Sequence, residues 1–278
     1  MTPLFTVITV TYNAAAVVER TLQSVLRQTV EDIEYIIVDG RSTDDTLAIV
    51  QRYATLTDDL RSQGYHHAVT TIVSEPDSGI YDAMNKGIRL AHGRFLCFLN
   101  AGDTFHTPTT LADLLTAAEN ATESSTNDST ADLPVVIYGQ TQLTDLAGHD
   151  LGPRRLSAPE RLTWRSFRRG MVVCHQSFIV RCEAAQADAY DLRYRYSADV
   201  DWCIRVMHHA QQQHPSTPVE KVLLNSRLII ADYLSEGTTT AHRWDSLKER
   251  FHIMRRHYGF PVTLLNHLWF IFRLVLKR

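Results

Sequence analysis

FTVITVTYN at residues 5–13 and EYIIVDGRSTDDT at residues 34–46 decide the fold of this chain. Each stretch is an apolar, β-branched run that ends abruptly in hydroxyl, amide and carboxylate groups, which is typical of buried strands in an α/β sheet. In an open sheet of this kind, ligands bind in the crevice beyond the carboxyl ends of the strands. We therefore expect the polar groups at the two strand ends to face one pocket, and a nucleotide is the ligand that they suggest.

Strands and helices alternate outward from these two stretches. Apolar spacing predicts helices over 14–28, 44–54, 80–91 and 200–209, and strands over 69–74, 94–99, 135–138 and 177–181. This alternation predicts a mainly parallel, Rossmann-like central sheet that is flanked by helices. Residues 119–132 are almost entirely Ala, Thr, Ser, Asn, Asp and Glu, so we expect a flexible surface loop there.

Composition narrows the functional class. A chain of 278 residues with 44% hydrophobic content can bury one large core. Its net charge of −3 gives no electrostatic case for a nucleic-acid partner. The four cysteines are scattered without a C-x-x-C pair, which argues against a disulfide framework or a zinc site and fits a reducing cytoplasm. The first strand begins too early to leave room for a signal peptide, which also favours a cytoplasmic protein.

The strand ends carry groups that suit a nucleoside diphosphate. Asp39 could accept hydrogen bonds from a base or a ribose, and Thr11 and Asn13 could line the base pocket. Asp103, which follows the strand at 94–99, could ligate Mg²⁺ or Mn²⁺ bridging two phosphates. Neither a Walker A sequence nor G-x-G-x-x-G follows the first strand, so the phosphates would depend on a metal or on basic side chains.

Four motifs indicate a protein family. They are TVTYN at 9–13, VDGRSTDDT at 38–46, SEPDSGIYDAMNKG at 74–87, and AHGRFLCFLNAGD at 91–103. Together they resemble family 2 glycosyltransferases, densely over the first hundred residues and more thinly through 174–176, 196–202 and Arg205. The resemblance implies a GT-A fold, a nucleotide-diphosphate sugar donor (UDP favoured), a divalent metal, Mn²⁺ or Mg²⁺, and inversion at the anomeric carbon.

The resemblance also implies roles for individual positions. The donor nucleotide would contact Thr11, Tyr12, Asn13, Asp39 and Ser42, the donor sugar and diphosphate would contact Asp77, Asp82, Lys86 and Asn100, and the acceptor would contact His175, Gln176, Asp201 and Trp202. Asp103 looks like the metal-binding aspartate of a D-x-D-type motif, although Asn100 and Gly102 stand at its other acidic positions.

Asp199 looks like the catalytic base of an inverting transfer, which must take the proton of the acceptor hydroxyl. Asp201 follows two residues later and on a helix would point about 200° away, so only one of the two is expected to face the substrate.

Purely structural roles for some of these residues, and other functions for the chain, are alternatives at this stage. Ser42 and Asp44 could cap the helix at 44–54, Asp103 could be a turn residue, and Asp199 could cap the helix that follows it. The loss of acidic groups at 100 and 102 motivates a degenerate protein that binds a nucleotide sugar or a partner without turnover. A sugar nucleotidyltransferase is a weaker alternative, because such enzymes normally carry a Gly-rich, basic phosphate loop near the N-terminus.

We predict a GT-A domain over 1–240, with a nucleotide-sugar-binding half at 1–103 and an acceptor half at 135–240, and a helical tail at 241–278. The segment 260–276 is too short and too interrupted by Asn266, His267 and Arg273 to span a membrane. Its Trp, Phe and Leu side chains suit an interfacial helix, with basic residues on anionic head groups. A helix docked on the catalytic domain or in a dimer interface is the alternative.

The predicted protein is thus an inverting glycosyltransferase of the hexosyltransferase type. It would add a sugar to a saccharide or lipid-linked saccharide in surface-polysaccharide synthesis, at the inner face of the cell membrane, with peripheral contact through 260–278. The surface-glycan part rests on family analogy alone.

Overall fold

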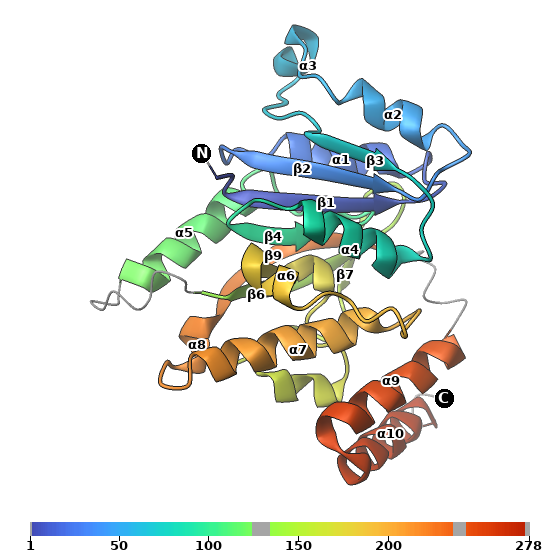
Figure 1. Ribbon diagram of the computed structural model, residues 1–278, viewed down its shortest axis with the longest axis vertical. Coiled ribbons are helices and arrows are strands. Elements are labelled where there is room, and N and C mark those ends of the chain that lie inside the picture. The colour runs from blue at the N-terminus through green and yellow to red at the C-terminus, as the bar shows by residue number, and fades with distance from the viewer. Residues whose placement is uncertain (1, 124–133, 236–242, 276–278) are drawn as a thin grey trace.

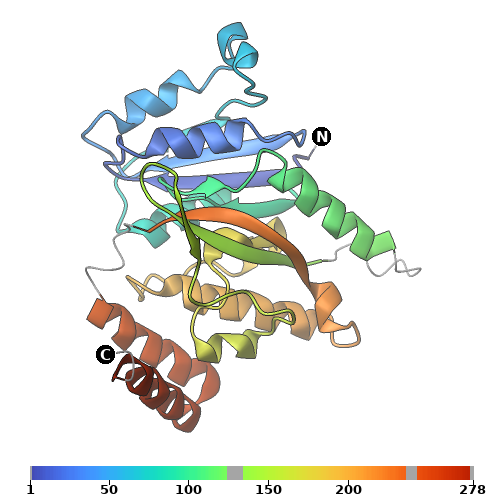
Figure 2. The same ribbon diagram turned by 180° about the vertical axis from the view of Figure 1, so that it is seen from behind.

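One curled sheet forms the centre of the molecule, and helices cover both of its faces (Figures 1 and 2). The computed structural model describes residues 2–123, 134–235 and 243–275. Within these residues the strand order is β3-β2-β1-β4-β8-β6-β9-β5, with β7 added beside β6. The strands are β1 Phe5–Thr11, β2 Ile33–Asp39, β3 Thr71–Ser74, β4 Phe95–Phe98, β5 Thr104–Phe105, β6 Val136–Thr144, β7 Asp150–Pro153, β8 Phe178–Arg181 and β9 Leu223–Leu234. The helices are α1 Val18–Leu26, α2 Thr46–Arg52, α3 Asp58–Ser62, α4 Ile80–Leu90, α5 Thr110–Glu123, α6 Cys182–Ala187, α7 Ala198–Gln213, α8 Val219–Val222, α9 Arg243–Tyr258 and α10 Phe260–Val275, with short 3₁₀ helices η2 Trp164–Arg169 and η3 His175–Ser177.

The first four strands along this order are parallel, as the sequence predicts. In the β1–β2 ladder Thr11 pairs with Asp39, and in the β2–β3 ladder Asp39 pairs with Ser74. The register therefore brings the polar ends of three strands side by side at one edge of the sheet. The two stretches that decide the fold do face one region.

The second half of the sheet is mixed: β6 and β9 are parallel, whereas its other pairs are antiparallel. β8 runs antiparallel to both β4 and β6, β7 is antiparallel to β6, and β5 is antiparallel to β9. A parallel pair needs a long crossover connection that returns the chain to the starting edge, and between β7 and β8 the chain forms only the short 3₁₀ helices η2 and η3. The chain reaches β8 directly from η3, so β8 runs back through the sheet in the opposite direction.

Two apolar cores lie on the two faces of the sheet. Along β1, Phe5 and Val7 face one core while Ile8 and Val10 face the other, which is the period of two expected of a strand. Helices α1, α2 and α5 pack on the first core and α4, α6 and α7 on the second. Gly87 of α4 permits a close approach to the sheet, because a Cβ there would lie 2.6 Å from Cγ2 of Ile8.

Several element boundaries differ from the sequence prediction. The helix expected over 200–209 extends from 198 to 213, and the strand expected over 135–138 continues to Thr144. Residues 119–123 belong to α5, so the predicted flexible loop does not begin at 119. The rest of that predicted loop, residues 124–132, lies outside the described residues. The helix predicted over 44–54 begins at Thr46, and neither Ser42 nor Asp44 occupies its N-cap, which is Asp45.

The chain ends in a hairpin of α9 and α10, at the lower right of Figure 1. α9 contacts α7 and η2, and α10 packs on α9. Among the helices that the structure describes, none has the length and apolar content that a membrane crossing requires.

Candidate active site

Asp39 organises the loop that follows β2. Its side chain is fully buried, and its carboxylate accepts hydrogen bonds from the backbone N–H and hydroxyl of Ser42 and from the hydroxyl of Ser74 (2.7 Å). Ser42 in turn accepts a hydrogen bond from the backbone N–H of Asn13. In this conformation Asp39 holds the strand ends together, so its predicted contact with a nucleoside stays a prediction.

The surface beside Asp39 is formed by Tyr12, Gly40 and Asp77. A Cβ on Gly40 would lie 2.5 Å from Oδ2 of Asp77 and 3.4 Å from Cδ2 of Tyr12, so only glycine lets these groups converge. The ring of Tyr12 is 65% exposed, and the buried hydroxyl of Thr11 has no hydrogen-bond partner within the described part of the chain. An exposed aromatic face beside unused polar groups is suited to a nucleoside base.

Asn13 has a backbone φ of 48°, in the left-handed region that costs energy for most side chains. Its Oδ1 accepts a hydrogen bond from the backbone N–H of Thr43 (2.8 Å), which joins the end of β1 to the loop after β2. Asn13 is thus used to shape this loop.

Asp82 and Lys86 make local contacts at the start of α4. Asp82 accepts hydrogen bonds from the backbone N–H and the hydroxyl of Ser78, which lower the pKa of its carboxyl. Lys86 donates to the carbonyl of Pro76 (2.7 Å) and pairs with Glu75 (3.0 Å). Both residues shape the loop between β3 and α4, and their predicted contacts with the donor sugar and diphosphate are not visible in this arrangement.

Asp103 joins three segments at the end of β4. Its Oδ1 accepts from the backbone N–H of Leu234 (2.9 Å) and its Oδ2 from Nε2 of Gln176 (2.6 Å). The side chain is only 4% exposed, and this burial raises the pKa of Asp103 to about 6. The turn that carries it includes Gly102, whose φ of +100° favours glycine.

Asp199 lies in the first turn of α7, and two neighbouring side chains approach its carboxylate. The hydroxyl of Tyr81 donates to Oδ1 (3.2 Å), and Nδ1 of His175 lies 3.7 Å from Oδ2. Nε2 of His175 lies 3.1 Å from Nδ2 of Asn100. Because an amide nitrogen can only donate, Nε2 accepts, and in the neutral ring the proton is on Nδ1, facing Asp199.

The environment keeps the Asp199 carboxyl ionised. Burial raises the pKa of Asp199, but the Nδ1–H of His175 and the charge of Arg250 outweigh that effect, so the pKa lies below its usual value. A carboxylate that is ionised at neutral pH and 15% exposed can accept a proton from a substrate hydroxyl.

The turn at 100–103 is the place where a divalent cation would fit. Oδ1 of Asn100 is buried and has no hydrogen-bond partner among the described residues, and the Asp103 carboxylate lies three residues away. Both are oxygen donors of the kind that Mn²⁺ and Mg²⁺ prefer. The part of the chain that the structure describes contains no cluster of three or more His, Cys, Asp or Glu that could hold a metal alone, so further ligands would come from the diphosphate and water.

All four predicted acceptor residues are buried in this conformation, so their contact with an acceptor stays a prediction. Trp202 is fully buried and stacks on Tyr190, with ring centroids 4.8 Å apart. Gln176 is 1% exposed and bound to Asp103. Asp201 is also fully buried, because it points away from Asp199 toward α9. Of the four, His175 alone lies beside Asp199.

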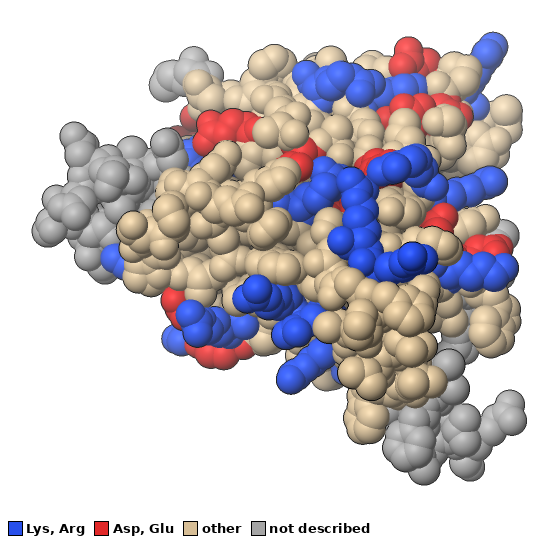
Figure 3. Space-filling view, turned by 60° about the horizontal axis from the view of Figure 1, so that its bottom comes forward, with Lys and Arg blue, Asp and Glu red and all other residues tan. Residues whose placement is uncertain are grey.

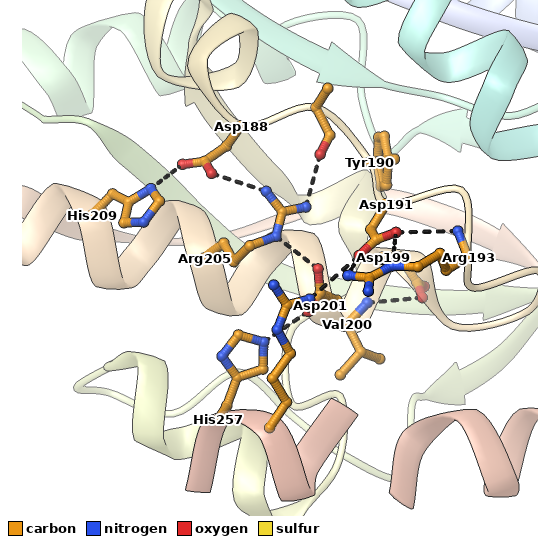
Figure 4. A network of polar contacts seen from close by, with 12 residues as sticks. Asp188, Tyr190, Asp191, Arg193, Asp199, Val200, Asp201, Arg205, His209 and His257 are labelled. Atoms are coloured by element: carbon orange, nitrogen blue, oxygen red, sulfur yellow. Dashed lines mark hydrogen bonds and ion pairs between the residues drawn. The ribbon is translucent and has the colours of Figure 1, made fainter. Parts of the chain in front are cut away.

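Asp201 belongs to a network centred on Arg205 (Figure 4). Arg205 donates to Asp201 (2.7 Å), to Asp188 (2.9 Å) and to the carbonyl of Ala189 (2.8 Å). His257 of α9 reaches the other oxygen of Asp201 at 2.7 Å. The network therefore ties α7, which carries the base, to the loop after α6 and to the C-terminal hairpin.

Helix α9 also holds the loop directly before Asp199. The carboxylate of Glu249 accepts from the backbone N–H groups of Arg195 and Tyr196, both at 2.8 Å. The hydroxyls of Ser246 and Ser197 are 2.9 Å apart and buried. The predicted helical tail at 241–278 includes α9, and these contacts make α9 a support of the site.

Sequence reasoning missed Tyr81, Ser74 and Glu249. Tyr81 and Ser74 lie within the SEPDSGIYDAMNKG motif, and the apolar ring of Tyr81 on the buried face of α4 hides its polar hydroxyl. Glu249 lies on a mostly polar helix whose pattern carries no signal for a contact with residues 195 and 196.

Residues 6–185 match the sequence model of the family described as Glycosyl transferase family 2. This match covers more than half of the chain. The chain belongs to glycosyl transferase family 2. The family predicted from the motifs is therefore confirmed.

Relatives of known description lie in the same family. The chain is 34% identical over 208 residues to a PGL/p-HBAD biosynthesis glycosyltransferase of Mycobacterium tuberculosis, an alignment that covers 73% of this chain and 69% of the relative. It is 38% identical over 101 residues to the putative teichuronic acid biosynthesis glycosyltransferase TuaG of Bacillus subtilis, covering 36% of each chain.

Solved structures share the fold. TarS 1–349 of S. aureus in complex with UDP-GlcNAc has a TM-score of 0.64 at 17% identity, over 91% of this chain and 64% of that one. The mannosyltransferase PcManGT of Pyrobaculum calidifontis, in complex with GDP-Man and Mn²⁺, has a TM-score of 0.59 at 17% identity, over 96% of this chain and 69% of that one. The predicted GT-A fold is confirmed.

Proposed function

We propose that this chain is an inverting glycosyltransferase that moves a sugar from a nucleotide-diphosphate donor, UDP favoured, to a hydroxyl of a saccharide or lipid-linked saccharide. The observation that carries the proposal is the environment of Asp199. Its carboxylate is ionised and lies between Tyr81 and His175. His175 in turn contacts Asn100, which follows β4. A purely binding protein does not need an ionised, partly buried carboxylate at this position.

The donor would lie across the ends of β1, β2 and β3. Tyr12 offers an exposed ring for the base, and Thr11 and Asp77 offer polar groups on the same side. Asp39, Ser42 and Asn13 hold the loop that forms this surface. Solved structures of this fold in complex with UDP-GlcNAc and with GDP-Man support a nucleotide-sugar donor.

Asp199 would act as the general base. An inverting transfer needs a carboxylate that takes the proton of the acceptor hydroxyl while the leaving diphosphate departs from the opposite side of the sugar. The Nδ1–H of His175 and the hydroxyl of Tyr81 orient the two oxygens of Asp199 and hold its charge. Both are therefore positioning groups for the base.

A divalent cation, Mn²⁺ or Mg²⁺, held by Asn100 Oδ1 and the Asp103 carboxylate would neutralise the negative charge of the departing diphosphate.

The product is proposed to be a surface glycan. Relatives of this chain are described as acting in PGL/p-HBAD biosynthesis and, putatively, in teichuronic acid biosynthesis. The proposal places the protein in the cytoplasm, at the inner face of the cell membrane, where a lipid-linked acceptor would be available.

A thermal-shift panel followed by a transfer assay tests the proposal. UDP, GDP and CMP are added with and without Mn²⁺, and a ligand that binds only the folded state raises the melting temperature. We expect one nucleotide diphosphate to give a metal-dependent shift, and its sugar conjugates to be consumed. Asp199→Asn should keep the shift and lose about 10²-fold or more in turnover. A variant that turns over like the unmodified chain refutes the base assignment, and a shift without turnover by any acceptor supports the degenerate alternative.

A further inference from the structure

Helix α10 turns its apolar side chains outward. Phe260, Leu264 and Leu268 are 50%, 40% and 55% exposed, and Leu265 and Trp269 are 68% and 54% exposed. Residues four apart on a helix share one side, so 260, 264 and 268 form one row and 265 and 269 form the adjacent row. We call these five residues the α10 outer face. It is an apolar stripe whose five side chains are each 40% exposed or more.

Among the side chains of 260–269, which the structure describes, the polar ones lie on the opposite side of α10, which packs on the protein. Thr263 is fully buried, and Asn266 and His267 are partly buried. Each bonds to the backbone of its own helix: Thr263 to the carbonyl of Gly259 (2.8 Å), Asn266 to that of Val262 (2.8 Å), and His267 to that of Thr263 (3.0 Å). A surface helix in water has the reverse arrangement, with its apolar side facing the protein. Over residues 260–269 the pattern of α10 therefore suits an apolar environment outside.

The surroundings of the α10 outer face are basic. The sequence contains no Asp or Glu after Glu249. Arg255 is exposed at the end of α9, and Arg165 and Arg169 are exposed on η2, which contacts α10. Figure 3 shows Lys and Arg side chains gathered across this side of the molecule, where Asp and Glu are sparser. An apolar stripe beside arginines complements a lipid bilayer, whose interior is apolar and whose anionic head groups attract arginine.

We propose that the α10 outer face is a docking surface for an anionic lipid bilayer, with α10 lying in the plane of the interface. The helix of 16 residues is too short to span the membrane, which needs about 20. A second copy of the chain fits less well, because a two-fold interface brings each patch against itself and would oppose arginine to arginine. Anionic head groups remove that repulsion.

The geometry links this surface to the base. α9 holds the loop before Asp199 through Glu249 and Ser246, and it carries α10 directly. In Figure 1 the hairpin lies on the side toward which β1 points and where α7 begins. Docking would therefore place the Asp199 end of the protein next to the lipid surface. This second step rests on the proposed function, because it assumes a lipid-linked acceptor.

Vesicle co-sedimentation tests the docking step without donor or acceptor. The full chain is mixed with vesicles of phosphatidylcholine alone or with about 30% phosphatidylglycerol, in low and high salt. We expect pelleting with the anionic vesicles and less pelleting in high salt, since the arginine contribution is screened. Leu265→Glu should weaken binding about tenfold or more, because a charge replaces a side chain that enters the lipid. Leu265 is so exposed that the variant should fold normally.

Leu151→Glu is the matched control. Leu151 is 53% exposed on β7, and the substitution adds the same charge to a different surface. The proposal is overturned if the unmodified chain does not pellet with anionic vesicles, or if both variants bind equally. It is also overturned if light scattering shows a dimer that Leu265→Glu dissociates while no vesicles are bound. The nucleotide thermal shift of Leu265→Glu should equal that of the unmodified chain, which separates a failure of docking from a failure of the proposed function.

Discussion

Replacing the buried carboxylate of Asp103 by an amide should stabilise the protein at high pH in the absence of metal. Asp103 is 4% exposed, and burial raises its pKa from 3.8 to about 6. A carboxyl whose pKa is higher in the folded state is easier to protonate there, so keeping it charged costs folding free energy. One pKa unit corresponds to about 1.4 kcal/mol, and the shift of about two units gives a cost of roughly 3 kcal/mol above about pH 7.

The sign of the pH dependence follows from the same shift. As the pH falls from about 7 to about 4, the folded chain takes up the Asp103 proton before the unfolded chain does, and the cost disappears. Asp103→Asn is neutral at every pH. The backbone N–H of Leu234 can still donate to its Oδ1, but Nε2 of Gln176 would face an amide N–H₂, which removes about 1 kcal/mol of hydrogen bonding. The net gain at pH 8 is therefore about 2 kcal/mol, and at about pH 4 it should be absent or reversed.

Urea unfolding with a chelator present, at about pH 8 and at the acid end of the range in which the chain stays folded, measures the effect. Asp113→Asn is the control, since it removes an exposed carboxylate from α5. The reasoning fails if Asp103→Asn is less stable than the unmodified chain at pH 8, or if the difference between them does not depend on pH. The same variant should lose the Mn²⁺-dependent part of the nucleotide thermal shift, because it removes the charged ligand of the proposed cation.

The remaining predictions concern the base, the Arg205 network and the packing of α4. Tyr81→Phe removes a hydrogen bond to the charged form of Asp199, so the pKa of the base should rise and the acidic limb of the kcat/KM profile should move up by as much as about one pH unit; an unchanged profile would contradict this. Asp201→Asn should lower the free energy of unfolding by about 3 kcal/mol, because it removes the buried carboxylate that Arg205 and His257 share, and an increase in acceptor KM without loss of stability would instead support the acceptor role. Gly87→Ala should cost about 1–3 kcal/mol by overpacking against Ile8, and urea unfolding should give a smaller cost for Gly87→Ala when it is measured in an Ile8→Ala background, because that substitution makes room for the added Cβ.

Local sequence patterns were sufficient for the donor half of the molecule. β1 and β2 begin and end close to where the apolar runs begin and end, because a strand buried on both faces must be apolar throughout. The polar residues at their ends were then placed together by the parallel register. The four motifs were sufficient to predict the family, because each of them lies at the end of a strand and is contiguous in the sequence.

Local patterns were not sufficient for the acceptor half. Asp199 and Asp201 look alike in the sequence, and only the packing of α7 against α9 shows that Asp201 is turned away from the site and paired with His257. Trp202 was read as an acceptor contact, but it is a core side chain because α7 lies across the aromatic cluster of Tyr190, Phe98 and Phe178. The direction of β8 likewise depends on the route of the chain between β7 and η3.

The sequence by itself determined the α/β class, the parallel donor half, the family, and the positions of Asp39, Asp103 and Asp199 at the ends of elements, because each depends on residues close together in the chain. The tertiary structure decided which groups surround Asp199, which carboxylates are buried and tied to other segments, and which side of α10 faces outward. Those properties depend on contacts between segments tens to more than a hundred residues apart, such as Tyr81 with Asp199 and Asp201 with His257. Side-chain burial and pairing at that distance follow from how the elements pack, which no local pattern specifies.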